Sequence, residues 1–198
     1  MNAFKKLLKI AVLGLLALGC QGGPARKEAT EPEFLYVKEH SHPPYSIQVG
    51  CYSPDGSMSL TSCRVRISQK KKVLETKTSE VDGQVAGSAV EDLDSDGNFE
   101  VLVFSRSAGS GSYGEAKALE WEGGRLRERP LPSLTGQQAK GYMGHDSFEV
   151  KDGAVVREFP VYRESDPNAS PSGGTRRITY HLKNNAWSCA SEDSAPGK

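Results

Sequence analysis

The sequence lacks the features of a nucleic-acid-binding protein, an α-helical protein or a zinc protein. Its 25 basic residues equal its 25 acidic residues, and no basic stripe with interleaved aromatic residues occurs, so we expect no nucleic-acid partner. No segment longer than about two helical turns has an apolar stripe at helical spacing. Only four cysteines are present, without a CxxC pair or histidines spaced for zinc.

The patterns of common hydrolase sites are also missing. No Gly-x-Ser-x-Gly elbow occurs between a strand and a helix, because no helix is predicted after Ser110 and Ser112. His145 and Asp146 are neighbours in sequence, which is not the orienting geometry of a catalytic triad. We therefore expect no catalytic residues and a protein that is not an enzyme.

The N-terminus has the pattern of a bacterial export signal. Met1 to Lys9 carries three lysines and no acid, and the apolar run Ile10 to Leu18 is too short to span a bilayer, so residues 1–19 are a predicted signal peptide. The end of this run, Leu16 to Cys20, resembles the lipobox of bacterial lipoproteins, which implies acylation of Cys20. The alternative is ordinary secretion with Cys20 unmodified.

The lipobox resemblance implies a membrane partner through the lipid. Gln21 follows the cysteine, and the sorting rule for such lipoproteins in a diderm host then indicates the outer membrane. We expect a lipid-anchored protein on the periplasm-facing outer membrane or the cell surface. Residues 20–33 are rich in Gly, Pro and charge and are predicted to be the lipidated cysteine and a flexible tether.

The rest of the chain is predicted to form one all-β domain, residues 34–189, followed by a disordered tail, residues 190–198. Period-two alternation between turn signals favours an antiparallel β-sandwich or flattened β-barrel. A short helix is predicted over Leu134 to Ala139. The predicted strands are Tyr45 to Tyr52, Leu60 to Ser68, Val73 to Val81, Gln84 to Leu93, Phe99 to Ser105, Ala116 to Glu122, Arg125 to Arg129, Asp146 to Val150, Ala154 to Tyr162, Arg176 to Leu182 and Ala186 to Cys189.

Three cysteines remain beyond Cys20, in an exported protein where disulfides persist. Cys51 and Cys63 flank a predicted turn between adjacent strands, so we favour a bridge between them. Cys189 is then free, although the sequence alone allows all three pairings.

An acidic turn precedes the most apolar strand. Asp92, Asp94 and Asp96 alternate and are followed by Gly97 and Glu100, a set of hard oxygen ligands that suits calcium. No Glu stands at the twelfth position and no helices flank the turn, so an EF-hand is not expected. The alternative is an acidic hairpin turn whose Asp side chains accept hydrogen bonds from local amides.

A second turn, after the same strand, is rich in small polar residues. Ser105 to Gly114 contains Ser110, Gly111 and Ser112 next to a single aromatic residue, Tyr113. Hydroxyls donate and accept hydrogen bonds, and glycine lets the backbone approach a partner closely. We interpret it as a protruding recognition loop; the alternative is a flexible Gly/Ser connection.

This loop, together with Tyr142 to Asp146, resembles the paired motifs of bacterial inhibitors of animal lysozymes. The surrounding segments Arg106 to Gly111, Asp92 to Gly97, Arg157 to Tyr162 and Pro171 to Gly174 are most similar to the periplasmic inhibitors of invertebrate-type (I-type) lysozyme. The resemblance implies an all-β inhibitor, often a homodimer, that places Ser110, Gly111, Ser112 and Tyr113 in the cleft of the lysozyme. Tyr142 and Asp146 would brace that loop.

The lipobox departs from this pattern, since it is closer to membrane-bound inhibitors of chicken-type (C-type) lysozyme, which makes a C-type target an alternative. The chemistry of the cleft agrees with a hydroxyl-rich loop, because one carboxyl is protonated there and the other is ionised. Asp146 would accept hydrogen bonds from loop amides or Tyr113, or else contact the enzyme with Tyr142. A different functional class also remains open, a calcium-binding surface lipoprotein with a binding or structural role.

Overall fold

A computed structural model describes residues 31–194 of the chain. The predicted signal peptide, Cys20 and most of the tether lie outside the described residues. The chain divides after Glu31, and the unit from Pro32 onward contains all the strands described below.

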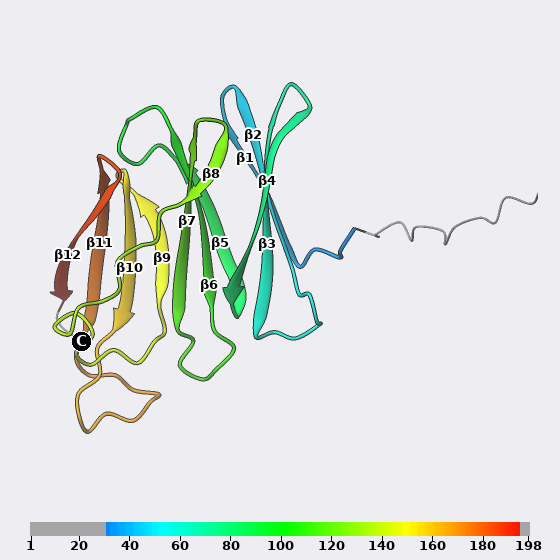
Figure 1. Ribbon diagram of the computed structural model, residues 1–198. Coiled ribbons are helices and arrows are strands. Elements are labelled where there is room, and N and C mark those ends of the chain that lie inside the picture. Colours follow the sequence, from blue (N-terminus) through cyan, green and yellow to red (C-terminus); the bar gives the residue numbers. More distant parts are fainter. Residues whose placement is uncertain (1–30, 195–198) are drawn as a thin grey trace, which may run out of the picture. The chain divides into compact units, whose positions relative to one another are not determined.

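Twelve antiparallel strands in the described residues form three four-stranded sheets, and within each sheet the strands pair in sequence order (Figure 1). The first sheet consists of β1 (Tyr36–His42), β2 (Tyr45–Tyr52), β3 (Leu60–Gln69) and β4 (Lys72–Asp82). The middle sheet consists of β5 (Gln84–Glu91), β6 (Phe99–Arg106), β7 (Gly114–Glu122) and β8 (Arg125–Glu128). The third consists of β9 (Ser147–Lys151), β10 (Ala154–Pro160), β11 (Thr175–Lys183) and β12 (Ala186–Ser194).

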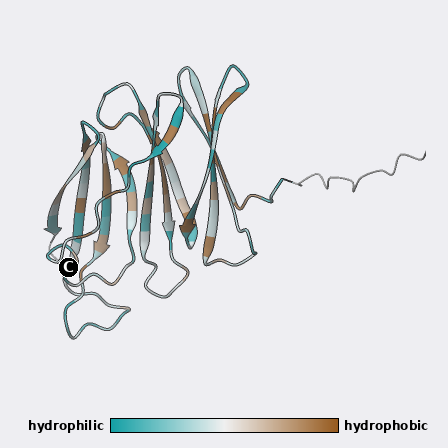
Figure 2. Cartoon of the chain, in the orientation of Figure 1, coloured by the Kyte–Doolittle hydropathy of each residue, from teal (hydrophilic) through white to brown (hydrophobic). Residues whose placement is uncertain are grey.

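Two hydrophobic cores lie on opposite faces of the middle sheet. Val101 and Val103 of β6 pack with residues of the first sheet, whereas Leu102 and Phe104 pack with residues of the third. Successive side chains of a strand point to opposite faces, and β6 is apolar on both. Figure 2 shows apolar residues spread along strands of all three sheets. The middle sheet is therefore the one whose two faces are both covered.

The all-β, antiparallel prediction is confirmed, and the arrangement is that of a sandwich whose sheets stay open. Each predicted strand overlaps an observed one. The sequence did not predict β1, because the residues of β1 opposite the core positions of β2 include Lys38 and His40, which break the apolar alternation. Asn184 and Asn185, between β11 and β12, both have positive φ, which a tight hairpin turn requires.

The predicted helix over residues 134–139 is wrong. Thr135 and Gln138 exchange side-chain hydrogen bonds with each other's amides, an arrangement that normally starts a helix. Only one turn follows, closed by the bond from the amide of Ala139 to the carbonyl of Thr135, and Gly141 then adopts φ 75°. The segment therefore bends without continuing as a helix. None of residues 31–194 forms a helix that could span a bilayer.

The predicted tail begins too early, since β12 continues to Ser194. Asp193 holds this end of the strand, because it accepts two hydrogen bonds from Arg176, at 2.6 and 2.7 Å. The same guanidinium donates to the carbonyls of Gln138 and Lys140. Residues 190–194 thus belong to the third sheet, and residues 195–198 lie outside the described part.

The predicted disulfide is confirmed. Cys51 and Cys63 are bonded and lie directly opposite each other on β2 and β3. Both are buried in the core between the first and middle sheets. Cys189 is an exposed free thiol on β12.

Candidate functional site

Two segments that are far apart in sequence meet at the end of β6. The first is the β6–β7 connection, residues 107–113, which Figure 1 shows at one end of the middle sheet. The second is the chain just before β9. The amide of His145 donates to the carbonyl of Gly111 at 2.7 Å, and the amide of Gly114 donates to Oδ2 of Asp146 at 2.7 Å. The structure thus brings the two predicted motifs together.

The contact between these segments is too close for a side chain at Gly144. This residue has φ 90°, and an added Cβ would lie 1.9 Å from the carbonyl oxygen of Gly111. Glycine supplies both the positive φ and the close approach. Gly144 is therefore needed to dock the second segment on the loop.

The 107–113 loop is also closed by its own hydrogen bonds. The amide of Ser107 donates to the carbonyl of Tyr113 at 2.8 Å, and the amide of Tyr113 donates to Oγ of Ser107 at 2.9 Å. Farther out, the amide of Ser112 donates to the carbonyl of Gly109 at 2.9 Å. These bonds disfavour the alternative of a flexible Gly/Ser connection.

A buried carboxylate, that of Asp146, supports the loop through hydrogen bonds. It is 1% exposed and accepts hydrogen bonds from the amide of Gly114, from the hydroxyl of Tyr142 at 2.6 Å and from Nε of Arg157 at 2.6 Å. Arg157 also donates to the hydroxyl oxygen of Tyr142 at 2.7 Å. A buried charge is tolerated when it is paired and hydrogen-bonded. Of the two arrangements expected for Asp146, the structure has the one in which Asp146 bonds a backbone amide of this segment, that of Gly114 directly after the loop.

Tyr142 lies between the loop and the core. Its ring meets that of Tyr113 edge-on at 5.5 Å and that of Phe159 at 4.7 Å between centroids. Burial raises the pKa of Tyr142, and its hydrogen bond to Asp146 acts in the same direction. Tyr142 therefore remains a hydrogen-bond donor at neutral pH and supports the ring of Tyr113.

The outer surface of the loop presents unpaired hydroxyl groups. Tyr113 is 50% exposed, and Ser110 is exposed. Among the bonds formed by residues 31–194, none involves the hydroxyls of Ser110, Ser112 or Tyr113. These groups can both donate to and accept from a partner.

A third segment, the β10–β11 connection, lies beside the loop. The sequence did not predict that this segment is part of the site. The hydroxyl of Tyr162 donates to the carbonyl of Asn168 at 2.9 Å. Asp166 shapes the connection by accepting bonds from the amides of Arg163 and Ser172, and these bonds lower its pKa. A hollow of about 110 Å³ separates the loop from this segment, and its walls are Ser110, Gly111, Tyr113, Met143, His145, Tyr162 and Asn168.

Arg157 also belongs to the site, although the sequence did not predict it there. It lies on β10 between Val155 and Phe159, which both face the core. A charged residue at a core-facing position of a strand needs a buried partner. That signal in the sequence could have identified Arg157 as the partner of an acidic residue.

The predicted acidic turn lies at the opposite end of β6 from the loop. Its residues Asp92, Asp94 and Asp96 each place a carboxylate oxygen within 4.8 Å of the others. Glu100, which was predicted with them, is completely buried at the start of β6. Burial raises the pKa of Glu100 to about 8, and the charges of Asp94 and Glu120 act in the same direction.

Comparisons of the chain with models of protein families, with curated proteins and with solved structures found no match.

Proposed function

We propose that this protein inhibits an animal lysozyme by inserting the 107–113 loop into the active-site cleft of the enzyme. The main support is the position of Tyr113, half exposed on a loop that is closed by its own hydrogen bonds and braced by Asp146. The resemblance to I-type lysozyme inhibitors favours an I-type target, with a C-type lysozyme as the alternative. In this role the protein is a binding partner and not an enzyme.

The unpaired hydroxyls suit the chemistry of a lysozyme cleft. One carboxyl group of such a cleft is protonated and the other is ionised. Hydroxyls of Ser110, Ser112 and Tyr113 can accept a bond from the first and donate to the second without burying a charge. A loop already held in shape also loses less conformational entropy on binding than a flexible one.

The acylated Cys20 that the lipobox implies would keep this inhibitor at a bacterial membrane. We propose that it faces the periplasm or the cell surface, where an incoming lysozyme would meet it before the cell wall. Its role would then be to protect the wall against a host enzyme.

The proposal is tested by removing the two groups expected to enter the cleft. We expect Tyr113→Ala combined with Ser110→Ala to raise the inhibition constant about 30-fold or more, the effect of losing about 2 kcal/mol at an interface hot spot. The measurement is residual lysis of bacterial walls by I-type and C-type lysozymes at increasing inhibitor concentration.

Val73→Ala is the matched control, since Val73 is a 49% exposed side chain near the start of β4, whose other end leads to β5. Both variants should keep the melting temperature of the parent protein. If the double variant inhibits as strongly as the parent, the loop is not the inhibitory element. If neither lysozyme class is inhibited by the parent, the function itself is wrong.

A further inference from the structure

The turn between β5 and β6 concentrates negative charge without a basic partner. Asp92, Asp94 and Asp96 place carboxylate oxygens within 4.8 Å of one another. None of the three forms an ion pair with a described Lys, Arg or His residue. Like charges at this separation repel, so the turn stores an unfavourable electrostatic energy that a cation would relieve.

Local hydrogen bonds already orient part of this cluster. Asp92 accepts from the amides of Asp96 and Gly97, at 3.1 and 3.0 Å. Asp96 accepts from the amide and the side chain of Asn98, at 2.8 and 3.0 Å. Each carboxylate oxygen has more than one lone pair, so these bonds leave capacity for a metal ion. The same bonds would also form in an acidic turn that binds no metal, so they do not by themselves indicate a ligand.

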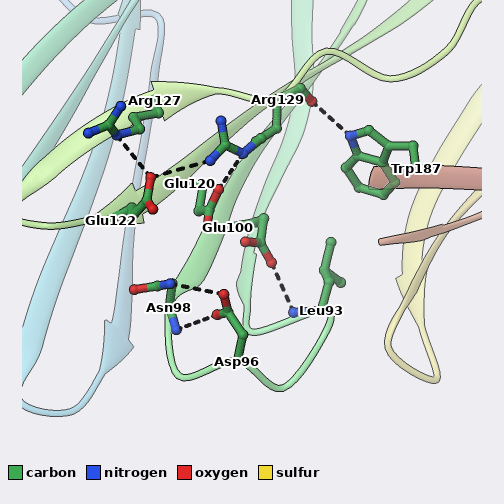
Figure 3. Close-up of polar contacts among 9 residues, drawn as sticks. All are labelled: Leu93, Asp96, Asn98, Glu100, Glu120, Glu122, Arg127, Arg129 and Trp187. Carbon is green, nitrogen blue, oxygen red and sulfur yellow. Dashed lines mark hydrogen bonds and ion pairs between the residues drawn. The ribbon is translucent and has the colours of Figure 1, made fainter. Parts of the chain in front are cut away.

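The independent observation is Glu100, a buried carboxyl group aimed at the same turn. Its exposed fraction is 0%, and its Oε2 accepts a bond from the amide of Leu93, which stands between Asp92 and Asp94. Its Oε1 has no hydrogen-bond partner. Figure 3 shows the Glu100 side chain pointing from β6 toward the turn that holds Leu93 and Asp96. A buried, unpaired oxygen of this kind is costly unless something binds it.

The neighbouring carboxylate shows that Glu100 differs from an ordinary buried acid. Glu120 lies directly opposite Glu100 on β7 and is also buried, but Glu120 forms an ion pair with Arg129 (Figure 3). No described basic residue reaches Glu100 in this way. The protein thus pairs one of the two buried acids with a basic residue and leaves the other facing the acidic turn.

We propose that Asp92, Asp94 and Asp96 bind one Ca²⁺ ion and that Glu100 supports the site from the core side. Calcium takes six to eight oxygen ligands in flexible geometry, which carboxylates at alternate positions of a turn can supply. Mg²⁺ is less suited, because it demands near-ideal octahedral geometry and keeps most of its water. The site stabilises the β5–β6 hairpin and is separate from the proposed lysozyme contact, which lies at the other end of β6.

The test uses the purified full-length chain, freed of metal with a chelator, and CaCl₂ as the probe. Calorimetric titration should give one bound Ca²⁺ per chain. Calcium a hundredfold above the dissociation constant should raise the melting temperature by about 5 °C or more over that in chelator. MgCl₂ at the same concentration should have a smaller effect. Equal melting temperatures in calcium and chelator, with no heat of binding, would overturn the proposal.

Two variants and one control locate the site. Asp94→Asn removes one ligand charge and should weaken calcium binding at least tenfold. Glu100→Gln keeps the shape of the buried side chain and should retain the fold in chelator while reducing the response to calcium. Asp55→Asn changes an aspartate that also accepts a hydrogen bond from a turn amide, in the β2–β3 connection, and should respond like the parent. A calcium response unchanged in both site variants would contradict this location, and none of these readouts depends on lysozyme.

Discussion

Asp146 is the residue on which the geometry of the 107–113 loop depends most directly. It joins the amide of Gly114, the residue that directly follows the loop, to the guanidinium of Arg157 and the hydroxyl of Tyr142. The side chain of Arg157 is only 12% exposed and lies against the rings of Phe148 and Phe159. Without its partner, this cation would be buried and unpaired, which is far more costly than losing a surface ion pair.

We therefore expect Asp146→Asn to lower the free energy of unfolding by about 3 to 5 kcal/mol, as measured by urea denaturation. Glu158→Gln is the control, because Glu158 pairs with Arg177 at 2.6 Å on the surface and such pairs contribute about 1 kcal/mol or less. Similar losses in the two variants would contradict a bracing role for Asp146. The Asn variant should also inhibit more weakly, since the loop loses its support.

At the scale of elements, β1 connects the first sheet to the middle sheet through polar contacts. The hydroxyl of Ser88 on β5 is 2.7 Å from that of Tyr36 and 2.8 Å from Nε2 of His40. Lys38 donates to the carbonyl of Ser88 at 3.1 Å. Burial lowers the pKa of His40, the charge of Lys38 lowers it further and that of Glu39 opposes the shift.

This contact should make stability depend on pH below neutrality. Because the pKa of His40 is lower in the folded chain, the unfolded chain binds the proton more readily as the pH falls below about 6.5. The contribution of His40 to the free energy of unfolding should therefore decrease between pH 7.5 and pH 5. Glu100 acts in the opposite direction over this range, because its raised pKa makes protonation favour the folded chain. His40→Gln should remove the His40 contribution and leave that of Glu100. His181→Gln, at an exposed position of β11, is the control. An identical pH profile for His40→Gln and the parent would contradict this role.

At the scale of the whole molecule, β6 connects two regions with different chemistry. Its first residues follow the acidic turn, and its last residues precede the hydroxyl-rich loop. Both faces of β6 are buried, one in each core, so the strand is held on two sides. A loop that emerges from such a strand has a rigid base, which is what an inhibitory loop requires.

The proposed lipid anchor gives a prediction for the complete protein. When the full chain is expressed in a diderm bacterium, we expect it in the membrane fraction, and Cys20→Ser should move it to the soluble fraction, because the acyl chains supply the membrane affinity. The measurement is immunoblotting of the two fractions. Cys189→Ser should remain with the membrane. A Cys20→Ser protein that still sediments with membranes would exclude this mode of attachment.

The amino-acid sequence by itself predicted every described strand except β1 and most of the turns, and it favoured the disulfide between Cys51 and Cys63 without excluding the other pairings. These features depend on the local alternation of apolar and polar residues, on residues that tolerate positive φ, and on pairing between neighbouring strands. Sequence also identified the loop and the acidic turn, whose residues are contiguous. It did not reveal β1, whose side chains on the core-facing side include polar residues.

Only the tertiary structure decided which strand faces meet and which distant polar groups become partners. Gly114 and Asp146 are joined across 32 residues, and Arg157 and Asp146 across 11. The wall formed by Tyr162 and Asn168 likewise exists only because the β10–β11 connection packs beside the loop. The alternation of apolar and polar residues along a strand indicates which side chains are buried. The partner of a buried charge depends on how the sheets pack together, and no local sequence pattern contains that information.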